Sequence, residues 1–147
     1  MDFDTSVKLN IYDTIARTTR MPTSIDIALL IGCSMADVEQ AFQRLCDKRL
    51  LVLEPGTTSR IRMAPPFSGI ETQHRVMVED KVYFANCAWD AFGIAAALKK
   101  DAEIESACAD CGKPLTFQIR DGKPLPQECV IHFAVPAAQW WRDIIYT

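Results

Sequence analysis

The sequence has 147 residues, of which 49% are hydrophobic, so it is long enough for one domain, or two very small ones, with a substantial core. Its formal net charge of −3 at pH 7 gives no reason to expect a nucleic acid or an anionic membrane as a partner. The N-terminus carries no signal peptide and no apolar run could span a bilayer, so we expect a cytoplasmic protein without a membrane partner. The six cysteines are then expected to be reduced thiols, reactive or metal-binding, and not a disulfide framework.

Residues 1–66 are predicted to form a winged-helix-like module. Apolar residues at helical spacing over 7–15 indicate a first helix. Ser24 and Ser34 are expected to cap a second and a third helix. Two short strands around a turn follow within 50–63. Because the third helix mixes acidic and basic residues and lacks the positive charge that phosphates attract, DNA binding is not expected.

Residues 67–147 are predicted to form a small, mainly antiparallel sheet around one central helix. The pattern indicates a hairpin, then an alanine-rich helix over 87–98, and then strands. The last of these strands is expected at 129–135, ahead of a terminal helix or strand at 139–146. The fold class is therefore α+β, with the N-terminal module packed on this core.

The start of the central helix carries the most suggestive residues. Asn86 is a good N-cap, which places Cys87 beside the first helical position. There the helix dipole should lower the pKa of the thiol and favour the thiolate. Asp90 lies three residues on and shares a face with Cys87. The alternative is a buried structural cysteine next to an aspartate that serves the helix N-terminus.

A second cysteine pattern is compatible with zinc. Cys108-x-x-Cys111 is followed by Gly112, and Cys129-x-x-His132 comes 17 residues later. Four ligands in two pairs satisfy tetrahedral zinc. However, residues three apart on a strand point to opposite faces, which weakens the second pair. Alternatively, Cys108 and Cys111 are turn residues near the core.

The layout resembles the organomercurial (alkylmercury) lyase family. The hairpin leads to Cys87-Ala88-Trp89-Asp90, which is similar to the family's catalytic Cys-x-x-Asp at a helix start. The turn with Cys108 is followed by Gly112-Lys113-Pro114, as in the family, and Cys129 stands just upstream of His132-Phe133. The chain ends soon after Trp141, so the resemblance implies a divergent and C-terminally short member.

The resemblance implies protonolysis of a carbon–mercury bond and hence a role in mercury detoxification. Cys87 and Cys129 would bind mercury as thiolates, because soft ligands suit soft metals. Asp90 would carry the proton to the departing carbon. The products would be a hydrocarbon and a mercuric ion held by Cys87, Asp90 and Cys129, without an organic cofactor. Small thiols or a mercuric reductase would accept the ion.

Two alternatives stay open at the level of sequence. Glu128 could occupy the second thiolate's position, with Cys129 facing away, since adjacent strand residues point to opposite faces. The protein could also lack lyase activity. It would then be a zinc- or soft-metal-binding module that uses Cys108, Cys111, Cys129 and His132, or a metal-responsive winged-helix regulator.

Overall fold

The computed structural model describes residues 1–145, and their architecture is α+β, as the sequence predicted. The helices are α1 (Phe3–Thr18), α2 (Ser24–Ile31), α3 (Met35–Asp47), α4 (Ala88–Leu98) and the 3-10 helix η1 (Ala137–Arg142). The strands are β1 (Val52–Leu53), β2 (Ile61–Ala64), β3 (Phe67–Ser68), β4 (Arg75–Val78), β5 (Lys81–Phe84), β6 (Ala102–Ala107), β7 (Pro114–Arg120) and β8 (Lys123–Pro124). Tyr146, at the end of the predicted terminal element, lies outside the described residues. None of the helices described has the length and hydrophobicity needed to cross a membrane.

The first three helices begin at side-chain caps. Ser34 caps α3 as predicted, because its side chain accepts the N–H of Asp37. The cap of α2 is Thr23 and not Ser24, since Thr23 forms a reciprocal capping box with Asp26. β1 and β2 then pair antiparallel, which completes the predicted order of three helices and a hairpin.

The strands form two antiparallel sheets. The smaller has the order β1-β2-β3, and its short edge strand β3 directly follows Pro65-Pro66. The larger has the order β5-β4-β6-β7-β8. A single bridge between Phe67 and Ala85 connects the two sheets.

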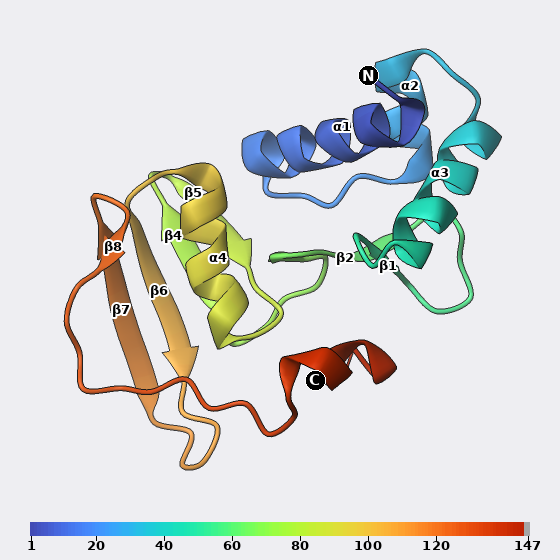
Figure 1. Ribbon diagram of the computed structural model, residues 1–147. Helices are drawn as coiled ribbons and strands as arrows, with labels where there is room; N and C mark the ends of the chain where they lie inside the picture. Colours follow the sequence, from blue (N-terminus) through green and yellow to red (C-terminus); the bar gives the residue numbers. More distant parts are fainter. Residues whose placement is uncertain (146–147) are drawn as a thin grey trace.

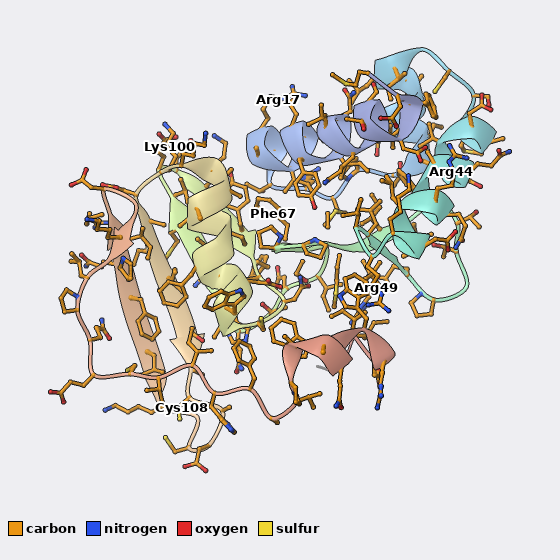
Figure 2. The ribbon with its side chains drawn as sticks, in the orientation of Figure 1. Arg17, Arg44, Arg49, Phe67, Lys100 and Cys108 are labelled. Atoms are coloured by element: carbon orange, nitrogen blue, oxygen red, sulfur yellow. The ribbon has the colours of Figure 1, made fainter. Side chains whose placement is uncertain are left out.

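One hydrophobic core runs through both predicted modules, from Val7 in α1 to Ile119 in β7. Phe67, only 2% exposed, lies at their junction and packs its ring against Tyr12 and Tyr83, with centroids 6.2 and 5.7 Å away. The Tyr83 hydroxyl donates to the Ala16 carbonyl at 2.7 Å. Figure 2 labels Phe67 between the group formed by α1, α2 and α3 and the part of the molecule that carries α4. Helix α1 is thereby fixed against the sheet that carries α4.

Helix α4 packs on one face of the larger sheet. Figure 1 shows it lying across this sheet, apart from the group formed by α1, α2 and α3. Ile94 of α4 is buried, as are Val76 and Ile104 on β4 and β6, two of the strands that α4 contacts. A Cβ added to Gly93 would lie 3.1 Å from Pro66, so α4 also approaches the chain before β3 closely. These contacts fix the position of the helix start.

The strand predicted at 129–135 is wrong, because the described chain from 125 to 136 contains no strand. Its β-favouring residues do not pair with the two-residue edge strand β8, since strand formation depends on a partner as well as on local preference. Instead the segment crosses the ends of β7 and β6 and continues to η1 (Figure 1). The Gln127 amide holds it by donating to the Thr116 carbonyl at 2.7 Å.

Candidate functional site

The N-cap of α4 is Cys87 itself, one residue later than predicted. Its backbone is extended, with φ −149°, and its sulfur accepts the N–H of Asp90 at 3.4 Å. A thiol sulfur thus takes the place of the usual oxygen at one of the free N–H groups of the first turn. Asn86 plays a different part, since its amide donates to the Asp90 carboxylate at 3.2 Å. The structure therefore brings Cys87 and Asp90 together, as the Cys-x-x-Asp spacing implied.

The electrostatics of this pair differ from the prediction. Burial raises the pKa of the Cys87 thiol, and the Asp90 N–H does not offset that effect. Burial also raises the pKa of Asp90, against the opposing effects of Asn86 and Cys87. The prediction of a Cys87 thiolate is wrong, because removal of the sulfur from water raises its pKa more than the N–H groups of the helix terminus lower it. The resting pair is a thiol beside a carboxyl group that holds a proton more readily than an exposed aspartate.

Tyr12 of α1 lies close to Asp90. Burial, followed by the negative charge of Asp90, raises the pKa of Tyr12 to about 12. The hydroxyl therefore stays protonated, and it donates to the Pro65 carbonyl at 2.8 Å. Helix α1 thus contributes to the enclosure of Asp90, although the family resemblance in the sequence centres on the second half of the chain.

A cavity of about 1240 Å³ opens beside the start of α4. Its lining includes Cys87, Trp89 and Phe92 from the α4 segment and is mainly apolar elsewhere, with contributions from β6, β7, the 125–135 segment and η1. Phe133 connects the cavity wall to α4, because its ring centroid lies 6.4 Å from that of Trp89 and 4.8 Å from that of Trp140. The cavity can hold an organic group against the Cys87 sulfur.

Cys129 lines the same cavity as Cys87 and its side chain is exposed. The neighbouring Glu128 is exposed too and is not part of the lining. Within residues 1–145, no three His, Cys, Asp or Glu side chains lie close enough together to hold a metal ion. The structure thus joins Cys87 to Asp90 directly, whereas Cys129 lines the shared cavity without completing the predicted three-ligand group of Cys87, Asp90 and Cys129 in the described residues.

The four-residue zinc pattern is not assembled. Cys108 and Cys111 lie in the turn after β6, where the backbone N–H groups of Cys111 and Asp110 lower the pKa of Cys108. Cys129 and His132 lie in the exposed, irregular 125–136 segment and complete no cluster with that turn in the described part of the chain. The zinc prediction is not supported, because the two pairs lie in separate segments that do not come together as one ligand group in the described residues.

His74 is a cavity residue to which the sequence analysis assigned no role. Its backbone carbonyl accepts the N–H of Ala85, and its Nδ1 lies 2.8 Å from the Ser106 hydroxyl. Burial lowers the pKa of His74, so the ring is neutral at pH 7. The sequence did offer one signal for the place of His74. His74 precedes the buried Val76 by two residues, and alternation along a strand puts both on the sheet face that α4 covers.

A thiol and a carboxyl group thus meet at a helix start, beside an apolar cavity in an α+β fold. A family model, that of alkylmercury lyase, matches residues 67–147, more than half of the sequence. The chain belongs to the alkylmercury lyase family. The match spans the α4 site and the cavity wall.

A solved structure, the crystal structure of the mercury-bound form of MerB2, is similar with a TM-score of 0.69 and 23% sequence identity. The likeness covers 86% of this chain and 60% of that chain, and at this identity it shows the shared fold. This protein therefore spans well under two thirds of the length of the structure it matches. A comparison with curated protein sequences gave no match.

Proposed function

We propose that this protein cleaves carbon–mercury bonds by protonolysis, yielding a hydrocarbon and a thiolate-bound mercuric ion. The observation that carries the proposal is the Cys87–Asp90 pair at the start of α4, beside a cavity of about 1240 Å³ that Cys87 lines. Membership of the alkylmercury lyase family supports the same chemistry. The mercury-bound state of MerB2 supports mercury as the ion to be held.

Cys87 makes the first bond to mercury. Its sulfur displaces a small ligand from the organomercurial, and the thiol proton passes to the neighbouring Asp90 carboxylate. Burial favours this transfer, because the pKa of Asp90 is raised and a metal-bound sulfur no longer retains its proton. The apolar cavity wall holds the organic group meanwhile.

Cys129 supplies the second sulfur. As it bonds to mercury, the carbon–mercury bond weakens, and the proton on Asp90 moves to the departing carbon. The Cys129 proton then replaces the one that Asp90 gave up. One carbon–mercury bond breaks and one carbon–hydrogen bond forms, with no change of oxidation state. The mercuric ion remains on Cys87 and Cys129, near Asp90, until a small thiol or a mercuric reductase takes it.

The position of Cys129 supports its role over that of Glu128. Cys129 lines the cavity with Cys87, whereas Glu128 does not. Cys129 belongs to an irregular segment, so alternation along a strand does not force these neighbours to opposite sides. The segment is anchored at Gln127 and through the contact of Phe133 with Trp89.

The decisive experiment measures hydrocarbon release. The protein is mixed with an arylmercurial and an excess of a small thiol, and the arene is quantified over time. We expect release with the natural protein and none above the thiol background with Cys87→Ser. Cys46→Ser, which removes a half-buried thiol of α3, is the matched control and should react normally. No release by the natural protein would refute the proposal.

A further inference from the structure

The turn between β6 and β7 carries Cys108 and Cys111, three residues apart. The Cys108 N–H donates to the Lys113 carbonyl, and the Gly112 N–H donates to the Cys108 carbonyl, both at 2.9 Å. Gly112 has a φ of +71°, which a glycine adopts readily and which lets the turn close. The bond from Gly112 closes one helical turn, in which side chains three residues apart are neighbours. The main chain therefore presents the two cysteines side by side before any ligand binds.

The pair connects the cavity with the protein surface. Cys108 lines the cavity that Cys87 and Cys129 share, and it is half-buried. Cys111 is exposed and lies outside the lining. The label in Figure 2 shows Cys108 at the lower end of the sheet, where the 125–135 segment crosses. A ligand shared by the two sulfurs would be reachable from both sides.

The number of protein ligands that the turn offers indicates which metal ion it would bind. A structural zinc site takes four protein ligands, and in residues 1–145 no third His, Cys, Asp or Glu joins Cys108 and Cys111. Thiolates select soft metals, and mercuric ion is satisfied by two sulfurs.

We propose that Cys108 and Cys111 form a second, two-thiol site that accepts mercuric ion from Cys87 and passes it to a thiol outside the protein. This inference rests on the proposed function, since the ion is the product of cleavage. Each step is a thiol exchange, in which one mercury–sulfur bond forms as another breaks. The proton of the incoming thiol moves to the released sulfur, and nothing is oxidised or reduced.

Binding is tested with mercuric ion alone, so this arm does not depend on cleavage. In the double variant Cys87→Ser/Cys129→Ser, the reduced protein is loaded with one equivalent of mercuric ion and challenged with free cysteine. We expect the ion to be retained, and retention to fall roughly 10²-fold when Cys111→Ser is added, because the second sulfur acts at a high effective concentration. Adding Cys46→Ser instead should change nothing. Equal retention with and without Cys111 would overturn the proposal.

Transfer is tested in the chain that keeps Cys87 and Cys129. After a single turnover with an arylmercurial, Cys111→Ser should leave the arene burst unchanged and slow the appearance of mercuric ion on added glutathione about tenfold. Cys111 is exposed, so this variant should fold normally, which its circular dichroism spectrum checks. Arene release with unchanged ion transfer would refute the second site alone. Absent arene release refutes the proposed function, while retention by the double variant still decides the second site.

Discussion

Replacing Asp90 with asparagine separates its chemical role from its structural one. The backbone N–H that Cys87 accepts is unaffected by the change. In the natural protein, the Asp90 carboxylate accepts an N–H of the Asn86 amide, while the Asn86 Oδ1 is buried and has no hydrogen-bond partner in the part of the chain described. A rotated Asn86 amide can accept from the new amide, so the variant can use an acceptor that the natural site leaves unpaired. The fold should therefore tolerate Asp90→Asn.

The effect on stability follows from the direction of the pKa shift. Because the folded-state pKa of Asp90 is raised above the unfolded value of about 3.9, its contribution to folding is fully present below that value and is lost as pH rises through the folded pKa. At pH 7 the ionised carboxylate is a cost to the folded state that a neutral amide does not carry. The free energy of unfolding of Asp90→Asn should thus match or exceed that of the natural protein by up to about 1 kcal/mol at pH 7.

The effect on activity should be much larger and opposite in sign. A positioned acid contributes about 10²–10⁴-fold to rate, which corresponds to about 3–5 kcal/mol of activation free energy. Arene release and urea unfolding at pH 5 and pH 7 measure the two effects on the same sample. Asp80→Asn is the matched control, since the Asp80 side chain is 89% exposed in the turn between β4 and β5. Unchanged turnover in Asp90→Asn would refute the assignment of Asp90 as the proton carrier, and loss of its fold would contradict the expected tolerance of the amide.

Three further predictions concern the cavity. Ser106→Ala should lower the free energy of unfolding by about 1–3 kcal/mol in urea titrations, because it leaves a half-buried ring nitrogen of His74 without its partner. The lowered folded-state pKa of His74 means that the unfolded chain binds more protons just below pH 6.5, so stability should fall as pH drops through about 6.5. His74→Gln should flatten that dependence, which a steeper profile would contradict. Cys129→Ser should reduce arene release about 10²-fold and Glu128→Gln should not, whereas the reverse order would assign Glu128 to the site.

The helices were predictable because their signals are local. Ser34 caps α3 from its own side chain, and the apolar spacing of α1 matches its buried face. The start of α4 was predicted to within one residue, since both Asn86 and Cys87 can accept an N–H there. The ionisation of Cys87 was not predictable from the same residues. It depends on burial beneath segments that are distant in sequence, which the position of a helix end does not reveal.

The positions of Cys129 and Cys108 could not be predicted from local sequence. Val130 and Ile131 favour a strand, yet β8, the edge strand on that side of the sheet, is only two residues long and the chain instead follows aromatic contacts at Phe133. The cavity that Cys87, Cys108 and Cys129 line is built from parts of the chain that are distant in sequence. Spacing suggested a zinc site at Cys108, Cys111, Cys129 and His132, whereas the tertiary arrangement places Cys108 in the same cavity as the proposed mercury site.

The burial of Cys87 has a chemical consequence for the proposed reaction. A permanently ionised thiolate would bind mercury without releasing a proton, so the proton for the carbon would have to come from elsewhere. A neutral thiol beside Asp90 brings its own proton into the site, and the raised pKa of Asp90 allows the carboxyl group to hold that proton until the carbon departs. The single environment that makes Cys87 a weaker acid thus makes Asp90 a better carrier. In the proposed reaction, coupling the two groups at one helix start would let metal binding itself load the acid that completes the cleavage.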